Sequence, residues 1–220
     1  MPLPRLPARR LLLLALWLAF VSYAFVCAPP GSDTTKDLIL DAILFRSDRL
    51  DVSVIAVFNL LGVLPTIYAS LLLADGAGRK LKAWPFVLGS CFLGAFALLP
   101  YLALREDDGR FLGKRQGAIR LFDSRALGVG LLVVTLLLVG LGLFQGELSR
   151  YLALFHSDSL VHVMTLDLIA LSLVFPSALG SDMERRGLRN STWFWLIAAV
   201  PLLGPAIYVA FRPRLSDATV

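Results

Sequence analysis

The sequence predicts an all-α membrane protein, a bundle of about six transmembrane helices with one amphipathic helix at the membrane surface. Its 220 residues are 57% hydrophobic and 17% charged, and the mean hydropathy is +0.75. Soluble domains average about 45–50% apolar and about 25% charged residues. Because a soluble fold needs a polar surface around its core, this composition excludes an ordinary cytosolic enzyme, a disordered chain and a coiled coil. We expect residues 1–220 to form a single integral membrane domain.

Six apolar blocks are long enough to be spans, since a bilayer-crossing helix needs about 20 mostly apolar residues. The predicted spans cover residues 11–28, 52–74, 84–104, 126–144, 159–179 and 193–211. The first block follows several arginines and precedes Cys27. We interpret it as an uncleaved signal anchor, and a cleaved secretion signal is the alternative.

Two polar connections stand out between these spans. Residues 33–48 have aspartates early and arginines late, which suits the helix dipole, and apolar residues fill the other face. We predict an amphipathic helix here that lies at the membrane surface or covers the bundle. The longest polar connection, residues 105–125, is rich in arginine and glycine, and its glycines favour turns over one long helix.

The net charge of +5 does not indicate nucleic-acid binding, because the basic residues lie in short runs between apolar blocks. Such runs are typical of loops that flank membrane spans. With six spans, the positive-inside rule favours a cytoplasmic or stromal position for residues 105–125 and places both termini on the other side. The expected partners are the lipid bilayer and other membrane subunits or further copies of this chain.

Asp167 is the principal candidate site residue. It is the one carboxylate among the 16 of this chain that lies well inside a predicted span, and ionisable residues at that depth are functional candidates by default. It could bind a proton, a cation or another ligand, or it could simply tie two helices together by a hydrogen bond. Asn59, a polar residue inside the second span, is the predicted partner of that bond.

His162 and two glycine patterns complete the candidate residues. His162 could be an axial ligand of chlorophyll or haem, and an interfacial histidine is the alternative. His162 and Asp167 do not share a helix face, and no motif predicts a metal site or a catalytic centre, so we do not expect an enzyme. Helix-packing steps are predicted at Gly142 with Gly146 and at Ser90 with Gly94.

The C-terminal part of the chain carries a recognisable pattern. It runs through Asp182-Met-Glu-Arg-Arg186, Trp193, Pro201-Leu-Leu-Gly204-Pro205, Tyr208 and Arg212-Pro213. This helix resembles the membrane-anchor segment of cardiolipin-synthase-type phospholipase D proteins, but the catalytic His-x-Lys motif of those enzymes is absent, so no activity carries over. Together with patterns around Asn59 and Pro100, it resembles an uncharacterised multi-pass membrane protein family of cyanobacteria and chloroplasts.

These observations lead to a functional expectation. The first hypothesis is an integral membrane protein of structural, assembly or interaction type, linked through the resemblance to a photosynthetic membrane. The resemblance implies the plasma or thylakoid membrane of a bacterium. The alternative hypothesis is a small transporter or channel that uses the intramembrane Asp167.

Overall fold

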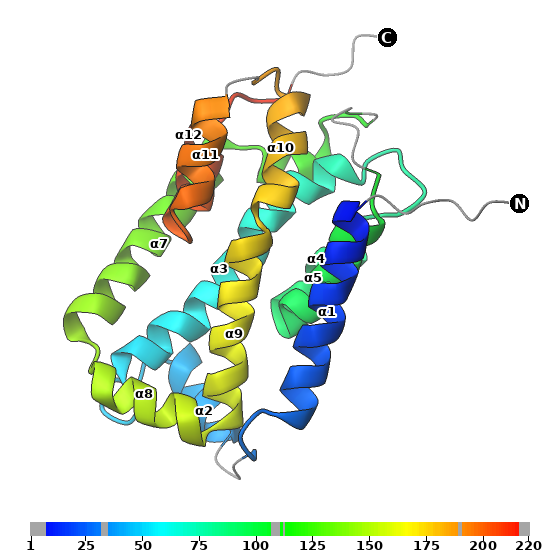
Figure 1. The fold of residues 1–220 in the computed structure, drawn as a ribbon. Coiled ribbons are helices and arrows are strands. Elements are labelled where there is room, and N and C mark those ends of the chain that lie inside the picture. The colour runs from blue at the N-terminus through cyan, green and yellow to red at the C-terminus, as the bar shows by residue number, and fades with distance from the viewer. Residues whose placement is uncertain (1–7, 32–34, 107–110, 112, 189–190, 216–220) are drawn as a thin grey trace, which may run out of the picture.

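Every element of regular structure that the computed structural model describes is a helix (Figure 1). The described residues are 8–31, 35–106, 111, 113–188 and 191–215. Four helical stretches among them are long and apolar enough to cross a membrane, so the expectation of six spans is wrong. The four are α1 (Ala8–Val26), α3 (Val52–Asp75), α7 (Arg125–Gln145), and α9 (Ser159–Val174) continued by α10 (Pro176–Arg185).

The predicted span 84–104 is a helical hairpin. Its arms are α4 (Trp84–Leu93) and α5 (Ala95–Leu104), and Gly94 turns the chain between them with φ +51°. The ring centroids of Phe86 and Tyr101 are 5.4 Å apart, whereas one continuous helix would separate these residues by about 22 Å along its axis. The arms are therefore antiparallel, and neither is long enough to cross a bilayer.

The predicted span 193–211 is a second helical hairpin, made of α11 (Ser191–Ala199) and α12 (Leu203–Phe211). The chain reverses at Leu202, which has φ +65°. Gly204 lies so close to α11 that a Cβ there would be 2.0 Å from the carbonyl oxygen of Ile197. Each arm has nine residues, or about 14 Å of helix, which is half of the hydrocarbon thickness of about 30 Å.

Both hairpins open toward one end of the bundle, which we call the polar end: the end where α3 finishes at Asp75 and α7 begins. The start of α1 lies there too, because Arg9 donates to the carbonyl oxygen of Leu102. So does the end of the described chain, since the backbone N–H of Leu215 donates to Asp123. The first and last described residues thus lie at the same end as α6 (Gly117–Phe122) of the connection 105–125, contrary to the expected opposite sides, because each hairpin returns to the end it left.

Short helices lie at each end of the bundle. Helix α6 (Gly117–Phe122) lies at the polar end, within the predicted connection 105–125, of which residues 107–110 and 112 are outside the described residues. Helices α2 (Thr35–Ile43) and α8 (Leu148–Ser157) lie at the other end, which we call the opposite end (Figure 1).

The predicted amphipathic helix 33–48 is shorter than expected. It ends as α2 at Ile43, and Phe45 has φ +54°, a conformation that a helix cannot contain. Residues 33 and 34, at the start of the prediction, lie outside the described residues.

Helix α3 is the centre of the bundle, and it packs against α7, α4, α9 and α2. The outer helices bury little of their surface. Phe25 at the end of α1 is 84% exposed and Phe144 at the end of α7 is 88% exposed. Because large exposed apolar surfaces are unusual on soluble monomers, this outer surface suits a lipid environment.

Candidate functional site

Asp167 lies where the α4–α5 hairpin turns. Its Oδ1 accepts a hydrogen bond of 2.6 Å from the backbone N–H of Ala95, the first residue of α5. The first N–H groups of a helix have no intrahelical acceptor, so Asp167 caps α5 from a neighbouring helix, α9. Gly94 allows this contact, because a Cβ there would lie 1.6 Å from Oδ2 of Asp167.

A cavity of about 590 Å³ begins at Asp167. It extends along the first half of α3 and the beginning of α9 to α2 at the opposite end. Its walls are apolar apart from a few polar side chains, among them Asp167 and Asn59. The lining residues are Ile39, Ile43, Phe58, Asn59, Leu61, Gly62, Ser90, Cys91, Phe92, Leu93, Gly94, Phe96, Leu160, Val163, Met164 and Asp167.

The bundle is closed on the other side of Asp167. One turn further toward the polar end, Leu98 and Leu171 are fully buried, as is Tyr68. The Tyr68 hydroxyl donates a hydrogen bond of 2.6 Å to the carbonyl oxygen of Leu171. The carboxylate therefore sits at the inner end of this cavity, which extends from it toward the opposite end.

Asn59 lines the same cavity, but its amide group is engaged elsewhere. Its Nδ2 donates to the carbonyl oxygens of Ala42, at 3.1 Å, and of Ile55, at 2.8 Å. Ala42 belongs to the last turn of α2, where the carbonyl oxygens accept no hydrogen bond from an N–H of the same helix. Asn59 makes these two hydrogen bonds in place of the expected one to Asp167. The bond to Ala42 links α3 to α2.

His162 lies near the start of α9, at the opposite end. Its Nδ1 is 2.8 Å from the carbonyl oxygen of Phe155, and its Nε2 is 3.0 Å from the hydroxyl of Tyr23. A carbonyl oxygen only accepts, so Nδ1 donates to Phe155, and Nε2 is paired with the Tyr23 hydroxyl. Binding to chlorophyll or haem iron would require Nε2 to give up Tyr23. Within the described part of the chain, no group of three or more His, Cys, Asp or Glu side chains could hold a metal ion.

The predicted helix-packing residues have different surroundings. Gly142 and Gly146 face α3, where added Cβ atoms would lie 3.1 Å from the Cβ of Ala56 and 1.8 Å from Oγ of Ser53. Ser90 donates to the carbonyl oxygen of Val87 in its own helix. Gly94 forms the hairpin turn.

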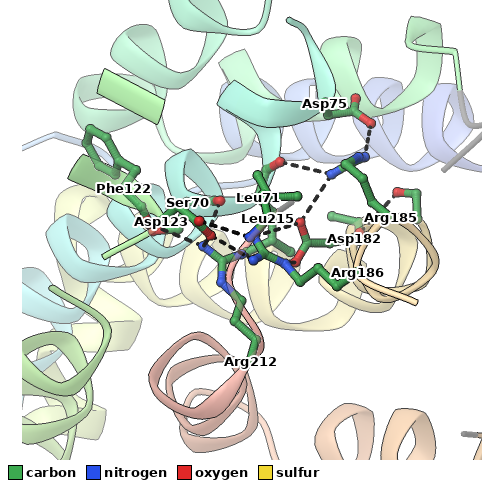
Figure 2. A network of polar contacts seen from close by, with 12 residues as sticks. Ser70, Leu71, Asp75, Phe122, Asp123, Asp182, Arg185, Arg186, Arg212 and Leu215 are labelled. Carbon is green, nitrogen blue, oxygen red and sulfur yellow. Dashed lines mark hydrogen bonds and ion pairs between the residues drawn. The ribbon is translucent and has the colours of Figure 1, made fainter. Parts of the chain in front are cut away.

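A buried ionic network that was not predicted from the sequence lies at the polar end (Figure 2). At its centre is Asp182 of α10, which is fully buried. Its carboxylate accepts hydrogen bonds from Arg185 at 3.1 Å, Arg186 at 2.7 Å and Arg212 at 3.0 Å, and from the hydroxyl of Tyr208 at 2.8 Å. These contacts join the end of α10 to the end of α12.

Two further aspartates extend this network. Asp75, at the end of α3, accepts from Arg105 at 2.8 Å and from Arg185 at 2.6 Å. Asp123 accepts from Arg186 and Arg115, both at 2.7 Å. Five arginines thus surround three aspartates among the described residues.

The charges of this network are mutually stabilised. Burial by itself would raise the pKa of Asp123, but the charge of Arg186 and hydrogen bonds from Arg186, Arg115 and the Leu215 N–H hold that pKa below its ordinary value. Burial would likewise lower the pKa of Arg186, and Asp182 and Asp123 raise it instead. Both side chains therefore remain charged, and removing either would leave a buried opposite charge.

One local signal for this network was present in the sequence. Asp182 precedes Arg185 and Arg186 by three and four positions, the spacings at which side chains meet on a helix surface. The other partners come from distant segments, and the predicted spans assigned them to separate loops on both sides of the membrane.

Comparison with known proteins gives no relative of this chain: no protein-family model, no curated protein and no solved structure matches it.

Proposed function

We propose that the chain is a small integral membrane transporter or channel in which Asp167 binds the transported species. The observation on which this rests is the position of that carboxylate: at the turn of a helical hairpin, and at the inner end of a cavity of about 590 Å³. The proposal includes four membrane crossings, by α1, α3, α7 and α9–α10, with the two hairpins entering from the polar end.

The hairpin turn supports this proposal on physical grounds. Irregular backbone at membrane depth is tolerated where it is buried in protein or lines a cavity, and transporters place substrate and ion sites at helices interrupted near the bilayer midplane. Gly94 is such an interruption, since the arms of its hairpin have ten residues each. That length reaches about 15 Å, the middle of the hydrocarbon layer.

The lining of the cavity indicates the class of ligand. A carboxylate favours a proton or a cation, and the rings of Phe58, Phe92 and Phe96 line the same cavity. Aromatic faces attract organic cations, and a volume of this size is typical of small-molecule sites. We infer that the species bound is a proton, an inorganic cation or a small organic cation.

The test is flux through Asp167→Asn in proteoliposomes. Asparagine keeps an oxygen that can accept from the Ala95 N–H, so the cap of α5 remains while the charge and the proton site are lost. With an imposed membrane potential and a pH-sensitive or cation-sensitive dye inside, we expect wild-type protein to accelerate entry and Asp167→Asn to reduce it to the rate of protein-free vesicles.

A second variant separates transport from stability. Asp167→Ala removes the cap as well, so we expect it to lower the melting temperature, whereas Asp167→Asn should melt within a few degrees of wild type. If wild-type protein gives no flux of protons or of inorganic or organic test cations, the transport proposal fails. If Asp167→Asn conducts like wild type, Asp167 is only a structural cap.

Assembly with other membrane subunits is a second proposed function, and the surface of α11 favours it. Trp195 and Leu196 on this short helix are 68% and 58% exposed. A partner helix could cover this surface, as would be expected of a subunit in a photosynthetic or plasma membrane of a bacterium. Gentle native purification followed by mass spectrometry and an absorption spectrum tests this. Recovery of the chain alone and without pigment would contradict it.

A further inference from the structure

A cavity separate from the one at Asp167 lies at the polar end, and the proposed function does not use it. It has a volume of about 380 Å³ and lies between the start of α7 and the end of α12. Three arginines and one aspartate supply its charged groups, and the remaining walls are apolar. The lining residues are Asp123, Arg125, Val209, Phe211, Arg212, Pro213 and Arg214.

The charge in this cavity is positive and lacks a counter-ion within the described chain. Asp123 is already neutralised by Arg186 and Arg115. Arg212 turns its guanidinium group inward, to Asp182 and to the carbonyl oxygen of Ser70. The side chains of Arg125 and Arg214 belong to exposed residues at the rim of the cavity. An anion placed in the cavity would be attracted by these two guanidinium groups.

An apolar cavity adjoins this basic one. It has a volume of about 260 Å³, and it shares Phe211, Arg212 and Pro213 with the basic cavity as a common wall. It continues along the α11–α12 hairpin past Trp193 to Ile197, toward the hairpin turn and away from the polar end. Basic groups at a membrane surface next to an apolar channel along a helix match a ligand with an anionic head and a hydrocarbon chain.

We propose that these two cavities form a binding site for a phosphate group, with Arg125 and Arg214 as its cations. The ligand is a phosphate of an anionic lipid, whose chain lies in the apolar cavity against Trp193, or a free phosphate ion held by the same arginines. This site is independent of Asp167, which lies at the turn of the other hairpin.

Quenching of tryptophan fluorescence by brominated lipid tests this site, because Trp193 lines the apolar cavity. In nanodiscs of phosphatidylcholine doped with phosphatidylglycerol brominated in its chains, we expect stronger quenching than with brominated phosphatidylcholine at the same fraction. The excess quenching should disappear in Trp193→Phe. Removing two cations should weaken the interaction with the anionic lipid roughly 30-fold, so Arg125→Gln/Arg214→Gln should abolish the excess.

A matched variant controls for net charge. Lys80 and Lys82 are exposed and also lie at the polar end, away from these cavities, so Lys80→Gln/Lys82→Gln should leave the excess quenching intact. Helical content and melting temperature establish that both double variants are folded.

A titration with inorganic phosphate in plain phosphatidylcholine nanodiscs distinguishes the two sources of the phosphate group. A saturable fluorescence change that is lost in Arg125→Gln/Arg214→Gln, without excess lipid quenching, assigns the site to free phosphate. If neither ligand gives a signal that depends on these two arginines, or if the lysine variant loses as much as the arginine variant, the proposal is overturned.

Discussion

Gly94 shows how a single residue determines the path of this chain. Its φ of +51° lies in the region that residues with a side chain rarely adopt, and its missing Cβ leaves the room that Asp167 occupies. Asp167 in turn supplies the acceptor for the first N–H of α5. Turn and cap are therefore coupled, because the space left by the missing Cβ of Gly94 is the space that the capping carboxylate occupies.

We therefore expect Gly94→Ala to destabilise the protein strongly. The backbone strain alone should cost about 1–3 kcal/mol, and the added methyl group would also displace the Asp167 carboxylate. Thermal unfolding in detergent measures the effect. Gly130→Ala is the matched control, because an added Cβ there meets no atom within 4 Å. Equal melting temperatures for the two variants would contradict this role of Gly94.

At the scale of elements, the ionic network holds the open ends of the two hairpins, in addition to their apolar packing. In the α11–α12 hairpin, α12 packs closely against α7 and buries six of its nine residues, whereas α11 leaves large side chains such as Trp195 and Leu196 exposed. Arg212, just after α12, is tied to Asp182 of α10 and to the carbonyl oxygen of Phe122 at the end of α6. The hairpin is thus fixed at its open end.

The pKa of Asp123 makes this attachment sensitive to acid. Its pKa is lowered in the folded state, so its contribution to stability is complete above the unfolded pKa of about 3.9 and is lost as the pH falls through the lower folded pKa. Removing one partner of a buried ion pair costs about 3–5 kcal/mol. We expect Asp123→Asn to melt well below wild type at pH 7.

This difference in melting temperature should shrink as the pH falls below about 4. Melting curves between pH 7 and pH 3 measure it, with Asp48→Asn as control, because the side chain of Asp48 is 75% exposed. A difference that stays constant across this range would contradict the assigned role of Asp123.

At the scale of the whole molecule, the hairpins gather most of the described lysines and arginines at the polar end. The described lysines and arginines at the opposite end are Lys36, Arg46, Arg49 and Arg150. With six spans the positive-inside rule gave a weak preference, because consecutive loops alternated between the two sides. With two hairpins the same rule predicts that the polar end faces the cytoplasm.

Labelling of single cysteines tests this topology. In a background of Cys27→Ser and Cys91→Ser, Lys82→Cys and Lys114→Cys flank the α4–α5 hairpin, and we expect a membrane-impermeant thiol reagent to reach both from the cytoplasmic side only. Arg49→Cys should label only from the other side. Labelling of Lys82→Cys and Lys114→Cys from opposite sides would show that residues 84–104 cross the membrane.

The sequence by itself determined the helical class, the apolar surface and the positions of the four long helices, because these depend on local composition and on the length of apolar blocks. It also identified Asp167 as a candidate, because a carboxylate inside an apolar block can be recognised without knowing its tertiary contacts. Asn59 was expected to bond to Asp167, whereas it donates to Ala42 and Ile55 and only shares a cavity with Asp167.

Only the tertiary structure decided that two of the six blocks turn back, that Asp167 caps one of these turns, and that arginines from four separate segments converge on three aspartates. The physical reason is that hydropathy measures apolar length, which is the same for one crossing helix and for two antiparallel arms of half that length. The direction of the chain depends on a single turn residue and on acceptors that lie far away in the sequence.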